Sequence, residues 1–403
     1  MVKKIKYIEN NKIYGIKYNY DLVRKEFTKM LKVCGAPKGL YNPCLLPLTD
    51  ANYFGLLSER SSSKTTQLLL FCLTFWKLYG TTIAYIRQLT QQVTRKMYKE
   101  VFKVINDPQW GYVSYLTDGE YNELVTDVEK KVYFAYRNEN GTIERQDTKY
   151  CMMLLAVEMS EIYTSSLNTL DTDLLIFDEF TRTPATGQDF VDFMQLIATI
   201  RRERRSLLIF LLSNTVTPYH QYLRELGVSS QLERMKRGQH AIITTPLGVR
   251  VYVELLDVAM HNTKEFKQTA LEYFGFENEA LRSIYGGEWE IKGFRHIPRG
   301  VDPVFKHTNI KLEFMGNYIT LQTFSEGKQY GVFLSPFTGK MRDEYIIISD
   351  QPKYAPHQLN GAYLPILRKL AEIDKTGHLY FSDNQTGLLY TSLYDYIVMG
   401  KKY

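Results

Sequence analysis

The run Leu174-Leu175-Ile176-Phe177-Asp178-Glu179 constrains the fold of this chain more than any other segment. Four apolar residues followed at once by two acidic ones have the length and boundaries of a buried strand. Such a strand ends at the carboxyl edge of a parallel sheet, which is where open α/β sheets bind ligands. At that edge Asp178 is placed to hold Mg²⁺ and Glu179 to polarise a water molecule. The run therefore predicts the acidic half of a nucleotide-hydrolysis site.

An earlier segment supplies the complementary half of such a site. Tyr53–Leu57 is a strand candidate, and residues 66–79 are apolar almost all round, as expected of a buried helix. A strand, a loop of small residues ending in Lys-Thr and a buried helix follow one another in a P-loop. The loop between them reads Ser58-Glu59-Arg60-Ser61-Ser62-Ser63-Lys64-Thr65.

The residue types of this loop fit phosphate chemistry. Backbone N–H groups surround the phosphates, Lys64 reaches the β- and γ-phosphates, and the Thr65 hydroxyl holds Mg²⁺. Ser58 and Ser63 stand where glycine is expected, because glycine permits a positive φ and a close backbone approach. We therefore expect a distorted or induced loop conformation. Taken alone, the segment favours an ordinary helix N-cap beside a stray lysine, and the acidic strand shifts the interpretation towards a nucleotide site.

Two further basic or polar segments belong to the same hypothesis. Residues 188–200 have the periodicity of an amphipathic helix and end in Arg201-Arg202-Glu203-Arg204-Arg205. Each of these arginines is a candidate arginine finger for a neighbouring subunit's nucleotide, or else a solvated cation favoured by the helix dipole. The apolar stretch Leu207–Leu212 delivers Ser213 and Asn214 to the same sheet edge, where Asn214 could contact the γ-phosphate or its water. Arg60 is expected to contact phosphate, or to pair with Glu59.

Length and punctuation suggest the domain organisation. At 403 residues, a prior of about 150 residues per domain predicts two or three domains. We expect an α/β fold divided into an N-terminal arm (1–40), a P-loop ATPase domain with a mainly parallel sheet (41–256), a helical linker or lid (257–300) and a smaller α+β domain (301–403). The formal charge of +6 permits a nucleic-acid partner without requiring one. No apolar stretch is long enough for a membrane span, so no membrane partner is expected.

Several of these motifs resemble those of one family. The loop 58–65 resembles the arginine-containing Walker A motif of viral genome-packaging ATPases, with serines for glycines, and Leu174–Phe180 looks like their Walker B motif. Arg202–Arg204 followed by Leu212–Asn214 is similar to their arginine-rich segment and coupling motif. Tyr380–Gln385 resembles the small podophage (phi-twenty-nine-like) DNA encapsidation proteins, which are related to terminase large subunits. The resemblance covers roughly residues 41–403.

The resemblance implies both a fold and an activity. The fold would be an additional-strand (ASCE) P-loop ATPase domain followed by a ribonuclease-H-like domain without nuclease activity. The activity would be that of a packaging motor, which uses ATP and Mg²⁺ to translocate double-stranded DNA into a procapsid. The implied partners are the portal (connector) protein, further copies of the chain in a ring that we expect to be a pentamer, and in some members a structural RNA. The protein would act in the host cytoplasm at the portal vertex and be absent from the mature virion.

Two alternatives to the packaging motor stay open. A P-loop helicase would need strand-separating elements, and none is identifiable in the sequence. A non-hydrolysing structural protein that binds DNA or the portal through a degenerate phosphate loop is the other alternative. The serines at the glycine positions are the best support for this second alternative.

Overall fold

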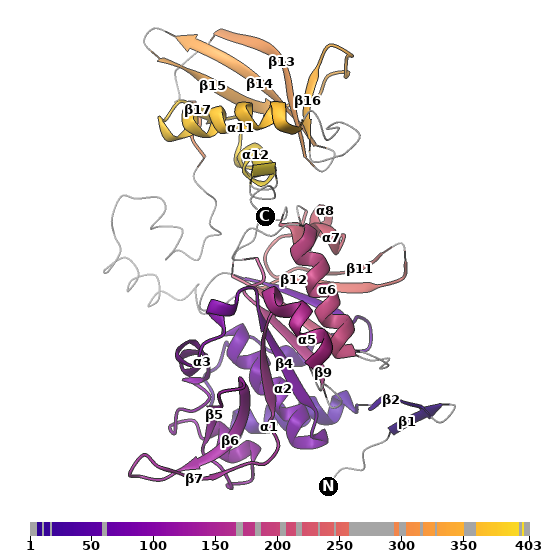
Figure 1. Cartoon of the computed structure of the whole chain (residues 1–403), viewed down its shortest axis with the longest axis vertical. Helices are drawn as coiled ribbons and strands as arrows, with labels where there is room; N and C mark the ends of the chain where they lie inside the picture. Colours follow the sequence, from indigo (N-terminus) through magenta and orange to yellow (C-terminus); the bar gives the residue numbers. More distant parts are fainter. Residues whose placement is uncertain are drawn as a thin grey trace. The chain divides into compact units, whose positions relative to one another are not determined.

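The chain forms two compact units, each of which has its own sheet (Figure 1). The first unit comprises residues 1–183, 187–218 and 222–269, and the second comprises 184–186, 219–221 and 270–403. The computed structural model describes residues 6–9, 12–16, 18–58, 63–166, 172–181, 187–201, 207–214, 220–232, 234–245, 247–257, 294–297, 304–314, 317–326, 329–349, 360–394 and 397–398. Of the predicted linker, only 257 and 294–297 fall within these ranges.

A ten-stranded sheet forms the centre of the first unit. Its parallel part, among the described residues, has the strand order β12 (Arg250–Leu255), β3 (Tyr53–Leu57), β10 (Leu208–Ser213), β9 (Thr172–Asp178), β4 (Thr82–Arg87) and β8 (Met152–Ala156). Antiparallel strands extend both ends of this part, namely β11 (His240–Thr244) beside β12, and β6 (Lys131–Arg137), β5 (Glu123–Thr126) and β7 (Ile143–Gln146) beyond β8.

The central strands are apolar along their whole length because both faces of the sheet are covered. Every residue of β3, β4, β8, β9 and β10 is buried. Strand β10 lies between β3 and β9 and pairs with both in parallel register. It is the additional strand expected between the strand that precedes the phosphate loop and the strand that ends in the acidic pair. The predicted α/β class with a mainly parallel sheet is confirmed.

Helix α2 (Lys64–Tyr79) covers one face of this sheet, and α6 (Gly187–Arg201) covers the other. Leu174 and Ile176 belong to the same core cluster as the buried side of α2, whereas the ring of Phe177 lies 4.9 Å from that of Phe193 on α6. Successive residues of a strand point to opposite faces. Asp178 therefore continues the side-chain row of Leu174 and Ile176, towards the N-terminus of α2.

Helix α1 (Tyr20–Val33) belongs to the core of the first unit. Its buried residues Val23, Phe27 and Met30 recur at the spacing of one helix face. The Phe27 ring packs edge-on against Phe71 of α2, with the ring centroids 5.3 Å apart. Just before α1, the hydroxyl of Tyr18 donates a 2.6 Å hydrogen bond to Asp173 at the start of β9. Part of the predicted N-terminal arm is thus packed against the sheet domain.

The remaining elements of the first unit are short. The helices are α3 (Arg95–Phe102), α4 (Tyr112–Leu116), α5 (Ser160–Ser166), α7 (Gln221–Glu225) and α8 (Ser229–Leu232), with 3-10 turns η1 (Pro43–Leu45), η2 (Thr90–Gln92) and η3 (Val157–Met159). An antiparallel pair, β1 (Lys6–Glu9) and β2 (Lys12–Ile16), precedes α1. No described helix is long and apolar enough to cross a membrane.

The second unit is the predicted smaller α+β domain. Its five-stranded sheet has the order β16 (Ile346–Ser349), β13 (Val304–Phe314), β14 (Asn317–Glu326), β15 (Gln329–Pro336) and β17 (Leu379–Phe381). Strands β13, β14 and β15 are antiparallel, and each edge strand is parallel to its neighbour. Helices α11 (Asn360–Lys375) and α12 (Asn384–Tyr394) contribute Leu367 and Leu393 to the core of this sheet.

Candidate nucleotide-binding site

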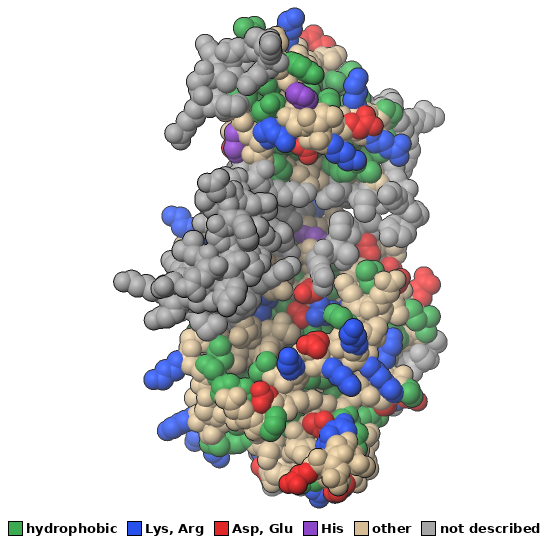
Figure 2. All heavy atoms as spheres, turned by 90° about the vertical axis from the view of Figure 1, so that its left-hand side faces the viewer, with side chains coloured by type: hydrophobic (Ala, Val, Ile, Leu, Met, Phe, Trp, Pro, Cys, Tyr) green, Lys and Arg blue, Asp and Glu red, His purple; other side chains and the backbone are tan. Residues whose placement is uncertain are grey.

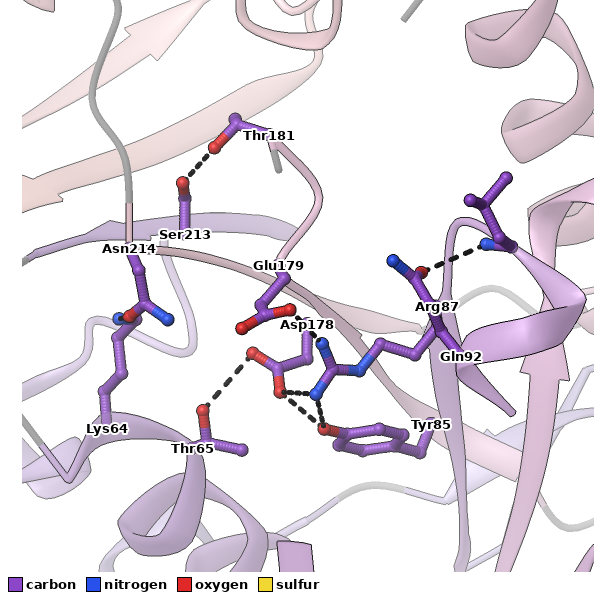
Figure 3. A network of polar contacts seen from close by, with 11 residues as sticks. Lys64, Thr65, Tyr85, Arg87, Gln92, Asp178, Glu179, Thr181, Ser213 and Asn214 are labelled. Carbon is purple, nitrogen blue, oxygen red and sulfur yellow. Dashed lines mark hydrogen bonds and ion pairs between the residues drawn. The ribbon is translucent and has the colours of Figure 1, made fainter. Parts of the chain in front are cut away.

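The side chains predicted from separate parts of the sequence meet at the carboxyl edge of the large sheet (Figure 3). Strand β3 ends at Ser58, β9 at Asp178 and Glu179, and β10 at Ser213 and Asn214. Backbone hydrogen bonds hold these strand ends in register, since Ser58 N–H donates to the Ser213 carbonyl at 3.1 Å. The sheet thus places the phosphate-loop and acidic segments side by side.

Lys64 lies in the centre of this edge and is only 2% exposed. Its ammonium donates a 2.8 Å hydrogen bond to Ser58 Oγ and a second, short one to Asn214 Oδ1. Burial lowers the pKa of Lys64 to about 8, although the nearby carboxylates of Asp178 and Glu179 act in the opposite direction. A buried ammonium whose partners within the described chain include two neutral oxygens is a strong candidate for receiving an anion.

The backbone on either side of the site adopts an unusual conformation. Ser63, the residue before α2, has φ +56°, and Glu179, the residue after β9, has φ +55°. A non-glycine residue in this left-handed region costs about 1–2 kcal/mol. The distortion expected where serine replaces glycine is therefore present at Ser63. At Glu179 the same conformation turns the chain sharply after the strand, so that consecutive carboxylates face different partners.

Thr65 and Asp178 supply oxygen atoms at a spacing that suits a small hard cation. Thr65 Oγ1 donates to Asp178 Oδ1 at 3.2 Å, although the two residues lie on different elements. Neighbouring ligands of an octahedral Mg²⁺ at about 2.0–2.1 Å are about 2.9 Å apart, so a modest adjustment would let both oxygens coordinate one ion. Asp178 is 4% exposed, and its position is fixed by the strand.

Sequence reasoning missed two residues of this site, Tyr85 and Arg87 on β4. Arg87 Nη1 contacts Glu179 Oε2 at 2.6 Å, and its Nη2 contacts Asp178 Oδ2 at 3.0 Å. Tyr85 donates a 2.5 Å hydrogen bond to Asp178 Oδ2 and accepts one from Arg87 Nη2 at 3.3 Å. One guanidinium therefore bridges both members of the acidic pair.

Electrostatics explains why this buried arginine stays charged. Burial by itself would lower the pKa of Arg87, but the neighbouring Tyr85, Asp178 and Glu179 outweigh it and raise the pKa. Burial, together with Asp178, raises the pKa of Tyr85 well above its usual value, so its hydroxyl remains a donor. The available sequence signal was a tyrosine and an arginine two residues apart, hence on one face, at the end of an otherwise apolar strand.

A second polar cluster fixes α6 behind the acidic pair. Gln88 follows Arg87, and its amide nitrogen donates to Asp189 Oδ1 of α6 at 2.8 Å. Its amide oxygen accepts a 2.8 Å hydrogen bond from Tyr222. The Tyr222 ring packs edge-on against Phe177 and Phe180, which flank the acidic pair. The end of β4 and the start of α6 are thereby tied to the same strand end.

Several predicted site residues cannot be placed. Arg201 is the last residue of α6 and is exposed. Those outside the described residues are Glu59, Arg60, Ser61, Ser62, Arg202, Arg204 and Arg205. The predicted roles of these residues stay predictions.

Comparison with known proteins gives matches only at the level of structure. No family model and no curated protein matches the chain. Among solved structures, the phi-28 gp11 DNA packaging motor matches over 90% of this chain and 98% of its own, with a TM-score of 0.48 and 14% identity. The chain is similar to bacteriophage DNA-packaging motors.

Two other solved structures extend the same similarity. The bacteriophage phi-29 viral genome packaging motor assembly matches over 88% of this chain and 99% of its own, with a TM-score of 0.46 and 14% identity. The large terminase of a thermophilic bacteriophage, in complex with ATP-gamma-S, matches over 93% and 86%, with a TM-score of 0.34 and 11% identity. The resemblance noted in the sequence thus reappears among solved structures. At such low identity the likeness concerns the fold, and any functional assignment has to rest on the site.

Proposed function

We propose that this protein is a viral genome-packaging ATPase that couples ATP hydrolysis to translocation of double-stranded DNA into a procapsid. The observation that carries the proposal is the meeting of Lys64 and Thr65 with Asp178 and Glu179, since Thr65 and Asp178 are 3.2 Å apart across two elements. Phosphoryl transfer to water needs a cation for the phosphates, a metal ligand and a carboxylate that aligns the water. All three are present at one sheet edge.

The roles follow from position and charge. Lys64 and the loop 58–65 would bind the triphosphate, and Asn214, which now accepts a hydrogen bond from Lys64, would contact the γ-phosphate side. Thr65 and Asp178 would hold Mg²⁺, which neutralises phosphate charge when bound. Glu179 would orient the attacking water and accept its proton.

Arg87 sets the condition under which Glu179 can act. The 2.6 Å ion pair between them lowers the basicity of the carboxylate, because the guanidinium stabilises its charged form. Glu179 therefore has to separate from Arg87 before it can accept a proton. The nucleotide-free arrangement is accordingly a resting state, in which Arg87 positions both carboxylates and restrains the base.

The remaining parts of the proposal rest on the family resemblance. An arginine of the 201–205 segment would complete the site of the next subunit in a pentameric ring. The ring would dock on the portal of the procapsid in the host cytoplasm, in some systems through a structural RNA, and would leave before the virion matures. The second unit would contact these partners without nuclease activity.

ATP turnover of the purified protein, with and without duplex DNA, tests the proposal. We expect Glu179→Gln to bind ATP normally and to lose turnover, and Lys64→Ala to lose nucleotide binding. The matched control is Glu129→Gln, whose carboxylate is 66% exposed and pairs only with Lys131 in the described structure. Wild-type turnover in Glu179→Gln would refute the assignment of the base. Absence of turnover in the wild type, under all DNA conditions, would favour a non-hydrolysing structural protein.

A further inference from the structure

Helix α3 presents a cationic surface that the proposed site does not use. Arg95, Lys96, Lys99 and Lys103 are all exposed, and we call them the α3 cationic face. At 3.6 residues per turn they fall within about 100° of the helix circumference. None of the four side chains forms an ion pair with a residue that the structure describes. Figure 2 looks onto the side of the first unit that carries α3 and shows Lys and Arg side chains at the surface with isolated acidic ones between them.

An ordinary solvated helix face does not explain this arrangement well. Arg95 and Lys99, and again Lys99 and Lys103, are four residues apart, where like charges destabilise a helix by about 0.2–0.5 kcal/mol per pair. Solvated helix faces usually relieve such repulsion with acidic residues at the same spacing. Here Glu100 is the only acidic residue between 95 and 103, and it lies at the margin of the cationic face. An anionic partner would offset the repulsion.

The opposite side of α3 is packed against the candidate nucleotide site. Tyr98 and Phe102 are 2% exposed. The Tyr98 ring lies edge-on to Tyr85, with the ring centroids 5.7 Å apart, and the Tyr85 hydroxyl bonds Asp178. Two rings in edge-on contact therefore separate the cationic face from the carboxylate proposed to hold the metal. A displacement of α3 would move Tyr98 against Tyr85.

We propose that the α3 cationic face binds the phosphate backbone of double-stranded DNA and transmits DNA contact to the nucleotide site through Tyr98 and Tyr85. This inference rests on the proposed function. Arg95 and Lys103 are about 12 Å apart along the helix, a length over which one strand of B-DNA presents about three to four phosphates. The apolar side of α3 is buried, so the helix offers charge without an insertable apolar face, which fits a duplex and not a membrane surface.

Binding of a linear duplex of mixed sequence, measured as a function of salt, tests the proposal in the full-length protein. The test variant replaces Arg95, Lys96, Lys99 and Lys103 with Gln. The matched control replaces four exposed lysines on and after α1 and loses the same net charge: Lys25, Lys29, Lys32 and Lys38. Each phosphate contact contributes about 0.9 to the slope of log affinity against log salt. If all four cations contact phosphate, a fourfold rise in salt weakens wild-type binding roughly a hundredfold more than it weakens binding by the test variant.

The outcomes separate this inference from the proposed function. A slope that falls in the test variant and not in the control supports the α3 cationic face as the DNA contact. Equal slopes in wild type and test variant overturn it, and retention of binding to an acidic protein partner alone would give this result. Should the fourfold variant misfold, Lys99→Gln has to lower the slope by about 0.9 by itself. Basal ATP turnover is measured on the same samples, and its absence in the wild type would refute the proposed function whatever the slopes show.

Discussion

Burial of Lys64 predicts that nucleotide affinity depends on pH in a range where most ATP-binding sites are insensitive. In the nucleotide-free protein, burial lowers the pKa of this ammonium to about 8. A bound triphosphate places several negative charges beside it, and opposite charges raise the pKa of an amine. The pKa should then return to at least the ordinary 10.5 of a lysine. Binding therefore takes up a proton whenever the pH lies between these two values.

The sign and size of the effect follow directly. Below pH 8 Lys64 is already charged and affinity is at its maximum, whereas above it an increasing fraction is neutral and must first gain a proton. At about pH 9 roughly nine-tenths of the free protein carries neutral Lys64, so affinity falls about tenfold relative to about pH 7. The ATP phosphates are fully ionised throughout this interval, because the last pKa of a phosphate ester is about 6, and do not contribute.

Calorimetric titration with a non-hydrolysable ATP analogue, in buffers of different ionisation enthalpy, measures both quantities at once. We expect uptake of about 0.1 proton at about pH 7 and about 0.9 proton at about pH 9, together with the tenfold loss of affinity. Carboxyl groups ordinarily titrate far below this interval, so the acidic pair that faces Lys64 should not contribute to the uptake. Affinity that stays constant across the interval, with no proton uptake, would show that Lys64 does not receive the phosphates.

Three other substitutions test separate parts of the structure. Arg87→Lys keeps the charge but cannot bridge Asp178 and Glu179, so we expect near-normal KM for ATP and kcat lowered by at least about tenfold; a normal kcat would contradict a positioning role. Phe27→Ala should destabilise the first unit by about 3–5 kcal/mol in denaturant unfolding, because Phe27 is fully buried against α2. A loss below about 1 kcal/mol would mean that α1 is not part of this core. Ser63→Gly relieves the left-handed backbone at φ +56° and should raise the melting temperature by a few degrees, whereas a fall would show that Ser63 is not strained.

The large sheet and its phosphate-loop helix could be predicted from sequence because each relies on local apolar pattern. Continuous apolar runs such as Leu174–Phe177 have few alternatives to a strand buried on both faces. The buried helix after the loop follows in the same way from its apolar circumference. Lys64, Thr65 and Asp178 could be grouped because carboxyl ends of parallel strands share one edge, and that rule needs no knowledge of long-range contacts.

Arg87 and the packing of α1 could not be predicted in this way. Nothing local distinguishes an arginine that ends a strand and turns to solvent from one that folds back onto two carboxylates. The difference lies in the strand order, since β4 is adjacent to β9 only after the sheet has assembled. The same holds for Tyr18, whose partner Asp173 is 155 residues away. Such contacts are properties of the assembled topology.

The candidate site collects nearly all of the conspicuous local frustration that the described part of the first unit contains. Ser63 and Glu179 have left-handed backbones, Lys64 is a buried ammonium, and Arg87 shares its charge between two carboxylates. Each of these features lowers the stability of the nucleotide-free fold, and the apolar strands that carry them offset that loss. A magnesium triphosphate would relieve several at once, because its phosphates can neutralise Lys64 and its metal ion can take over Asp178 from Arg87. The site is thus built so that ligand charge, rather than protein contacts, completes it, and this is why Glu179 can be held by Arg87 until the nucleotide arrives.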